Sequence, residues 1–314
     1  MTNVSYNVAG IDIAKASADV CLLRDGSAHS ASFADPRSLC RELAARKVTL
    51  AVVEPTGGYE RPVIAALDEV GIPVAVVNAR LIRDFARASG LLAKTDRLDA
   101  RVLAEYAHRM RPEPRPRKTP ARQRLSALVR RRRQLVGMRK AERTRRQQTQ
   151  ELDLLEDIQN AIAFLTSEIK AVEKRIQCHI DEHGELSTAA GLMRSMPGIG
   201  AVAAASLLAE LPELGILSRR KIAALVGLAP FSRDSGSFRG RRTVWGGRAD
   251  LRSTLHMGVI SAIRADTQFK HIYTAMRERG KPHKVATTAI LRKMIVQLNA
   301  MLRDQTTYSQ QHSC

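Results

Sequence analysis

The sequence predicts an α/β domain at the N-terminus, a long helical or coiled-coil arm in the middle and a mostly α-helical domain at the C-terminus. Three observations favour this fold class: β-rich runs alternate with helical stretches up to residue 108, a strongly basic segment follows, and amphipathic helix patterns rich in alanine and leucine fill the rest. A chain of 314 residues is long enough for two separate cores. We place the boundaries at residues 1–108, 109–185 and 186–304, with a tail at 305–314.

Four short β-rich runs are the expected strands of the first domain: "YNVAGIDIA", "ADVCLLRDG", "VTLAVVEPTGG" and "IPVAVVNAR". Residues 36–46 and 59–70 have helical patterns, and the second ends at Gly71, a common helix stop. The stretch "GLLAKTDRLDARVLAEYA", residues 90–107, reads as another amphipathic helix. This alternation is typical of one compact α/β unit.

The central segment is basic, with sixteen Lys or Arg residues against two acids between residues 109 and 150. Its proline-rich start predicts a linker and the remainder a basic helix, on which we expect Arg131, Arg132 and Arg133 to contact phosphates. Further on, apolar residues recur at steps of four and three, a pattern that predicts a coiled coil or a long helical hairpin. Such an arm either dimerises or packs against the protein's own domains. The apolar positions are Ile158, Ile162, Leu165, Ile169, Val172, Ile176 and Ile180.

The C-terminal part contains a possible phosphate-binding turn. The stretch "SMPGIGAVAAASLLAEL" resembles a helix-hairpin-helix element, in which the backbone around Gly198 and Gly200 would offer N–H groups to a phosphate at a helix start. The alternative is a tight turn that lets two helices pack closely.

The charge balance indicates a polyanionic partner. Lys and Arg number 51 against 31 Asp and Glu, for a net charge of +20 and a pI near 10.6. Aromatic residues make up only 4% of the chain, so recognition through shape and phosphates is favoured over extensive base stacking. Because no apolar stretch approaches a membrane span and the N-terminus lacks a secretion signal, we expect a cytoplasmic protein without a membrane partner.

The four cysteines, Cys21, Cys40, Cys178 and Cys314, show no CxxC or Cys/His ligand spacing. Neither a disulfide framework nor a zinc site is therefore predicted, and we expect ordinary reduced thiols.

Four acids in the first domain fall where strand and helix ends are expected. Asp12 lies within a β-rich run, Glu54 ends another, and Asp96 and Asp99 share one face of a helix. Converging carboxylates repel one another unless divalent cations neutralise them, and two Mg²⁺ ions about 4 Å apart can drive phosphodiester displacement. The alternative is structural: Asp96 pairs with a neighbouring arginine and Glu54 caps the next helix.

A second candidate is the loop "GLAPFSRDSGSFRGRRTVWGGRADLR", residues 227–252, rich in glycine and arginine. Its arginines are suited to holding phosphates through forked hydrogen bonds, and a serine among them could act as a nucleophile if activated. Residue chemistry alone leaves Ser232, Ser235 and Ser237 open. The arginines are Arg233, Arg239, Arg241, Arg242 and Arg248.

Three motifs carry a resemblance that composition does not supply. "AGIDIAKASADV", "VVEPTGGYERPVIAALDEVGIPVAVVNARLIRDFARASGLLAKTDRLDARVLAEYA" and the 227–252 loop resemble the DEDD transposases of bridge-RNA-guided insertion sequences, the family that includes the Piv DNA invertases. The resemblance implies a RuvC-like, ribonuclease-H-type N-terminal domain. Its acidic tetrad would be Asp12, Glu54, Asp96 and Asp99, holding two Mg²⁺ ions or Mn²⁺, and its nucleophile would be Ser235.

The resemblance also implies partners and a reaction. A transposase of this kind would cut and rejoin donor and target DNA through a phosphoserine intermediate, with a noncoding guide RNA, as a dimer or a synaptic tetramer. The serine domain and the acidic domain would meet in a composite site, commonly from different protomers. Two alternatives are a metal-dependent junction nuclease without a covalent step and a non-catalytic architectural protein.

Overall fold

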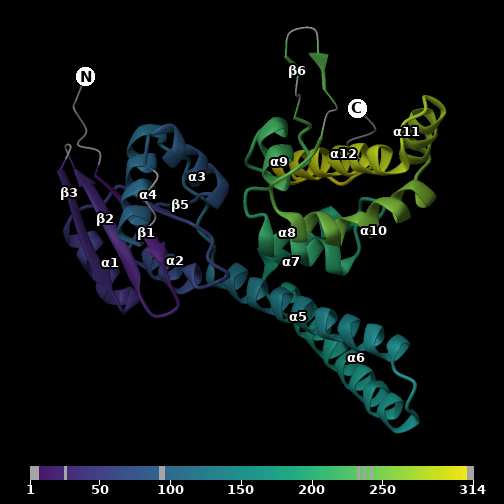
Figure 1. The fold of residues 1–314 in the computed structure, drawn as a ribbon. Coiled ribbons are helices and arrows are strands. Elements are labelled where there is room, and N and C mark those ends of the chain that lie inside the picture. The colour runs from purple at the N-terminus through teal and green to yellow at the C-terminus, as the bar shows by residue number, and fades with distance from the viewer. Residues whose placement is uncertain are drawn as a thin grey trace. The chain divides into compact units, whose positions relative to one another are not determined.

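The structure, a computed structural model, describes residues 7–24, 27–91, 96–231, 234–235, 238–240 and 243–309, without the side chains of residues 96, 97, 234, 235, 238 and 239. The chain divides into two compact units, Met1–Arg117 (unit 1) and Lys118–Cys314 (unit 2), which Figure 1 colours from purple to yellow along the chain. The basic segment after residue 117 therefore folds with the C-terminal helices. The finer division at residues 108, 185 and 304 stays a prediction.

Unit 1 is built on a five-stranded mixed sheet with the order β3-β2-β1-β4-β5. Strand β1 pairs antiparallel with β2 and parallel with β4. This is the order of a ribonuclease-H-like sheet, so the expected fold class is confirmed. The strands are β1 (Val8–Ile13), β2 (Ala18–Arg24), β3 (Ser27–Phe33), β4 (Leu50–Val53) and β5 (Val74–Val76).

Helices cover both faces of this sheet, which is why the central strands are apolar on both sides. On one face Ile11 packs with Leu39 of α1 and Leu67 of α2, and on the other Val8 packs with Leu103 of α4. The helices are α1 (Pro36–Ala45), α2 (Glu60–Glu69), α3 (Ala79–Ala88) and α4 (Asp96–Met110).

Gly10 fixes the position of α4 on the sheet. A Cβ atom at Gly10 would lie 2.2 Å from the carbonyl oxygen of Ala100 and 2.2 Å from the amide nitrogen of Ala104. The backbone of α4 therefore rests directly on β1, at a distance that only glycine permits.

Two elements of unit 1 were not predicted from the sequence. Strand β3 is a mostly exposed edge strand of small and polar residues, so it lacks the apolar alternation of a strand. Helix α3 buries only Ile82 among its residues, and its start is set by Asn78, whose side chain accepts a hydrogen bond from the amide of Arg80 at 2.8 Å.

The proline-rich segment before the basic helix is bound to unit 1. The amide of Arg115 donates to the carbonyl of Val74 at 2.8 Å, and its guanidinium pairs with Asp68 at 2.5 Å. Both side chains of this ion pair are largely buried, at 14% and 11% exposed. The first part of the segment predicted as a linker is thus an extended chain that packs against the sheet domain.

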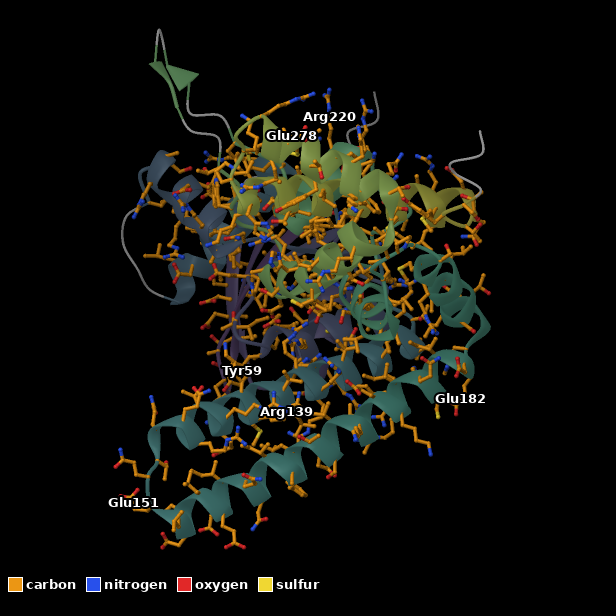
Figure 2. All side chains as sticks on the ribbon, turned by 90° about the vertical axis from the view of Figure 1, so that its right-hand side faces the viewer. Tyr59, Arg139, Glu151, Glu182, Arg220 and Glu278 are labelled. Carbon is orange, nitrogen blue, oxygen red and sulfur yellow. The ribbon has the colours of Figure 1, made fainter. Side chains whose placement is uncertain are left out.

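Unit 2 begins with a long helical hairpin, α5 (Pro120–Gln148) and α6 (Leu152–Asp181). Figure 2 shows the two helices side by side, with Glu151 at their connection and Glu182 at the other end of α6. Residues Leu165 to Ile180 of the predicted seam are buried in the same core as Leu125 and Val129 of α5. This part of the seam therefore packs within the chain, and dimerisation through the arm stays a prediction.

In the described residues, the rest of unit 2 is helical apart from one short hairpin. Its helices share one apolar core, in which Ile290, Ile295 and Leu298 of α12 are fully buried. Among the described residues, no helix has both the length and the apolar character needed to cross a bilayer. The elements are α7 (Gly184–Arg194), α8 (Ala201–Glu210), α9 (Arg219–Val226), β6 (Asp234–Ser235), β7 (Phe238–Arg239), α10 (Ala249–Ala265), α11 (Thr267–Glu278) and α12 (His283–Asp304).

Candidate functional site

Asp12 and Glu54 lie at the carboxyl ends of neighbouring parallel strands. The register pairs Ile11 of β1 with Val53 of β4, and the next residue along each chain is Asp12 or Glu54. Because side chains alternate along a strand, Asp12 points to the same face as Gly10, the face that α4 covers. Both acids are half-buried.

Helix α4 brings Asp96 and Asp99 toward this pair. Val8 at the start of β1 packs in one cluster with Ala107, and Gly10 meets Ala100 and Ala104. Strand β1 and helix α4 therefore run in opposite directions. Asp12, the next residue of β1 on this face, lies toward the first turn of the helix. That turn contains Asp99, which is half-buried, and Asp96, whose side chain lies outside the described residues.

Contacts of neighbouring groups bear on the structural alternative for Glu54, and the side chain of Asp96 lies outside the described residues. The turn before α2 is held by Glu60, whose carboxylate accepts hydrogen bonds from the amides of Thr56 at 3.0 Å and Gly58 at 2.9 Å. Glu54 is therefore not needed as the cap of that helix. Arg101, an expected partner of Asp96, pairs with Glu105 at 3.4 Å.

The acids share one end of the sheet but are not closed around a common point. Among the described side chains, Asp12, Glu54 and Asp99 do not form a group whose ligand atoms all lie within 4.8 Å of one another. Each of the three has an interaction within the protein. Their chemistry fits Mg²⁺, which prefers carboxylate oxygens, and chelation of one ion by all three would require their ligand atoms to come closer together.

A fifth acid, Asp19, was missed by the sequence analysis. It lies directly opposite Asp12 in the β1–β2 pair and accepts a hydrogen bond from the hydroxyl of Ser32. Directly opposite residues of antiparallel strands point to one face, so Asp19 adds a carboxylate beside Asp12. The signal was present, since the two aspartates lie at matching distances from the turn in "IDIAKASAD".

The favoured serine lies on a hairpin of unit 2. Ser235 of β6 pairs with Phe238 of β7, and a backbone bridge between Phe231 and Thr243 closes the base of the hairpin. The 227–252 loop thus contains paired backbone. Ser232, Ser237, Arg233, Arg241 and Arg242 lie outside the described residues, as do the side chains of Ser235 and Arg239.

Several arginines expected to bind phosphates are engaged within the protein. Arg248 donates through both terminal nitrogens to Glu213, each at 2.6 Å, and also to the carbonyl of Glu210 at 2.7 Å. Arg132 pairs with Glu173 at 2.7 Å, and Arg133 pairs with Glu210 and with Asp250. These contacts join the helices of unit 2.

The "PGIG" turn has the close helix packing that one of its two predicted roles requires. Gly198 has φ +86°, and a Cβ there would lie 2.1 Å from the carbonyl oxygen of Gly258 on α10, so this glycine allows close helix packing. Gly200 is the exposed N-cap of α8 and has open space around it. Phosphate binding at this helix start stays a prediction.

One group of metal-ligand side chains was not anticipated. His179, Glu182 and His183 at the junction of α6 and α7 bring one ligand atom each to within 4.8 Å of the others. His179 Nε2 lies 2.9 Å from the carbonyl of Ala121, and His183 Nδ1 lies 2.8 Å from the carbonyl of His179. The His179 contact joins the end of α6 to the start of α5, and the His183 contact holds that ring against the last turn of α6.

The described cysteines are free thiols, as predicted. Cys21 and Cys40 are buried, and burial raises the pKa of both thiols, that of Cys40 to about 11. Cys178 is exposed. The two buried thiols therefore stay protonated and unreactive near neutral pH.

Comparisons with known proteins agree with the geometry. A family model described as a transposase, of the DEDD type from IS110 elements, matches residues 9–156, and a model described as the transposase of the IS116/IS110/IS902 family matches residues 190–274. Together they span about three quarters of the chain. The first covers the acids, and the second covers the serine hairpin.

Relatives match the whole chain or its parts. The pilin gene-inverting proteins of Moraxella bovis and Moraxella lacunata are each 27% identical over 321 residues, covering 97% of this chain and 98% of theirs. An uncharacterized 43.6 kDa protein of insertion element IS110 from Streptomyces coelicolor is 33% identical over 141 residues, covering 44% of this chain and 34% of its own.

Among solved structures, T. thermophilus RuvC in complex with a Holliday junction substrate is similar over 33% of this chain and 95% of its own, with 15% identity and a TM-score of 0.28. The family models and the full-length relatives agree from the sheet domain to the serine hairpin. The chain therefore belongs to the IS110 family of DEDD transposases, enzymes that recombine DNA.

Proposed function

We propose that this transposase cuts DNA with its four acids and a divalent metal, and holds the cut strand on Ser235 until it is rejoined. The observation that supports this most is the shared face of the sheet, where Asp12 and Glu54 end adjacent parallel strands and the first turn of α4 lies over them. Carboxylates from three separate chain segments lie toward this end of the sheet, and a divalent cation bound between them would offset their mutual repulsion.

The residues that would hold the metal are Asp12, Glu54, Asp96 and Asp99, and two Mg²⁺ ions or Mn²⁺ fit their oxygen donors. When bound, such ions stabilise the negative charge that develops at a phosphate and favour the deprotonated form of an attacking hydroxyl. The protein's part is to fix these side chains. The sheet holds Asp12 and Glu54, and the contact at Gly10 holds α4.

The covalent step exchanges one phosphodiester for another. The Ser235 oxygen loses its proton, forms a bond to the phosphorus of the DNA strand, and displaces a strand oxygen that leaves as a hydroxyl. The hydroxyl of an incoming strand reverses the exchange and returns the proton to serine. No bond energy is lost to water, so the strand can be rejoined without a high-energy cofactor.

The acids and the serine belong to different units, so we propose that they act on one phosphate only when the protein is assembled on DNA. Assembly as a homo-oligomer would let one protomer supply the serine and another the acids. Insertion and inversion share this strand exchange, which agrees with relatives named for insertion elements and for gene inversion.

A noncoding guide RNA is the proposed source of sequence specificity. The chain has a net charge of +20 and only 4% aromatic residues. This composition is suited to binding nucleic-acid backbones through their phosphates rather than to recognising bases. Purifying the protein from cells and sequencing the bound RNA tests this. A specific RNA whose loops match flanking DNA supports guidance, and an RNA-free active protein contradicts it.

The covalent step is tested by trapping. Wild-type protein, supercoiled DNA and Mg²⁺ should give a protein–DNA adduct on a denaturing gel, absent in Ser235→Ala and in Asp12→Asn but present in Ser232→Ala and Ser237→Ala. An undiminished adduct in Ser235→Ala excludes that serine. Cleavage without any adduct in wild-type protein favours the junction nuclease, and binding without cleavage favours the architectural protein.

A further inference from the structure

Unit 2 contains a basic groove outside the residues considered so far. Helices α9 and α12 lie side by side (Figure 1), and the groove along them has a volume of about 1220 Å³. This exceeds the usual range of small-molecule pockets, roughly 300–1,000 Å³. Seven of its lining residues are Lys or Arg and none is acidic. These cations are Arg219, Arg220, Arg279, Lys281, Lys284, Arg292 and Lys293.

Within the described part of the chain, acids do not neutralise the cations of this groove. Among the residues that the structure describes, none of the seven forms an ion pair with an acid, whereas Arg132, Arg133 and Arg248 all do. Arg292 and Lys293 are half-buried in the wall, and Arg220 lies at the outer surface in Figure 2. Like charges gathered without counter-ions repel one another, so the groove is suited to an anionic ligand.

Two helix starts reinforce this positive potential. Helix α9 begins at Arg219 and the 22-residue helix α12 begins at His283, and both starts adjoin lining residues of the groove. The first amides of a helix have no partner within it, and the helix dipole places partial positive charge there. Phosphate groups are the ligands that such starts bind best.

The groove continues into the base of the serine hairpin. Pro230 and Val244 line it, and their neighbours Phe231 and Trp245 form a ring pair with centroids 5.3 Å apart. These rings are 44% and 45% exposed, a large surface in a chain with few aromatics. Ser235 lies four residues beyond Phe231, at most about 14 Å along an extended chain.

We propose that this groove binds the phosphate backbone of the DNA strand that Ser235 attacks, with an unstacked base resting on Phe231 and Trp245. Continuity with the serine hairpin favours the DNA substrate over a guide RNA as the occupant. Backbone contacts would hold the strand, and the ring pair would accept a base that the reaction has freed from the duplex. The proposal rests on the proposed role of Ser235.

Trp245 is the single tryptophan of the chain, so its fluorescence reports on this groove without a label. A short single-stranded DNA titrated into the full-length protein should quench it. The double variant Lys284→Gln/Arg292→Gln should bind about tenfold more weakly or worse, with a salt dependence shallower by about 1.4 in log–log slope for two lost contacts. The matched control is Arg264→Gln/Lys270→Gln, which removes two exposed cations of α10 and α11 outside the groove.

Unchanged affinity and salt slope in the groove variant overturn the proposal, as does RNA of the same sequence quenching Trp245 at lower concentration than DNA. Ser235→Ala should bind the DNA as wild type does, because the substitution leaves the seven cations of the groove in place. If Ser235→Ala binds normally yet still forms an adduct, the assignment of the serine fails and the groove stands. If the groove variant binds normally while Ser235→Ala loses the adduct, only the groove proposal fails.

Discussion

Replacing Gly10 by alanine should separate α4 from the sheet. The added Cβ would lie 2.2 Å from two backbone atoms of α4, where ordinary van der Waals contacts begin at 3.4 Å. Backbone cannot rotate away as a side chain can, so helix and strand must part by about 1.2 Å. Overpacking of this kind costs about 1–3 kcal/mol of unfolding free energy.

The same displacement should impair cleavage, because α4 carries Asp96 and Asp99 while Asp12 stays on the strand. Misplacing catalytic groups by about 1 Å can lower a rate by about 100-fold. The assays are urea unfolding followed by circular dichroism and Mg²⁺-dependent cleavage of supercoiled DNA, at a temperature where the variant is folded.

Gly137→Ala on α5 is the control, because a Cβ there meets no atom within 4 Å. It should keep full cleavage and gain about 0.5–1 kcal/mol, as glycine in a helix interior is unfavourable. A Gly10→Ala protein with unchanged stability would refute the close contact of α4 with β1. Lower stability with an undiminished cleavage rate would show that α4 does not position the acids.

Three further predictions concern other parts of the molecule. Arg248→Ala should lose on the order of 3 kcal/mol in urea unfolding, because its glutamate partner is buried and left unpaired, yet the folded variant should keep its DNA affinity; a weaker affinity would restore Arg248 as a phosphate ligand. Gly198→Ala should be clearly destabilised, since its φ is +86° and its Cβ would meet a backbone oxygen, whereas Gly200→Ala should fold normally; equal melting temperatures would contradict this. Iodoacetamide at about pH 8 should label Cys178 much faster than Cys40, as measured by mass spectrometry. The pKa of Cys40 is raised to about 11. The contribution of the protonated Cys40 thiol to the free energy of unfolding is therefore complete below the unfolded-state pKa of about 8.5 and is lost as pH rises through 11.

Much of the fold followed from local patterns in the sequence. Apolar runs predicted four of the five strands of the main sheet, and the amphipathic period of residues 90–107 predicted a helix that the structure has at Asp96–Met110. Strand β3 was not predicted because an exposed edge strand needs no apolar face. Its pairing with β2 is determined by its place in the sheet rather than by the β propensity of its own residues.

The sequence singled out Asp12 and Glu54 because they interrupt or end apolar runs, and Asp96 and Asp99 because they share one face of a helix. Asp19 was missed because its relation to Asp12 depends on strand register. Charge was harder to interpret. The run at Arg132 and Arg133 looked like a phosphate-binding surface, but acids distant in sequence neutralise it. The groove cations are scattered between residues 219 and 293, so only the packing of α9 against α12 gathers them.

The central claim is that the acids of the sheet domain bind a divalent metal together. The most direct test is Mn²⁺ binding to the full-length protein, measured by electron paramagnetic resonance in wild type, Asp12→Asn, Asp99→Asn and the exposed control Asp84→Asn. We predict that wild type and Asp84→Asn bind Mn²⁺ equally, while Asp12→Asn and Asp99→Asn each bind it at least about tenfold more weakly. Equal Mn²⁺ affinity in all four proteins would contradict the claim.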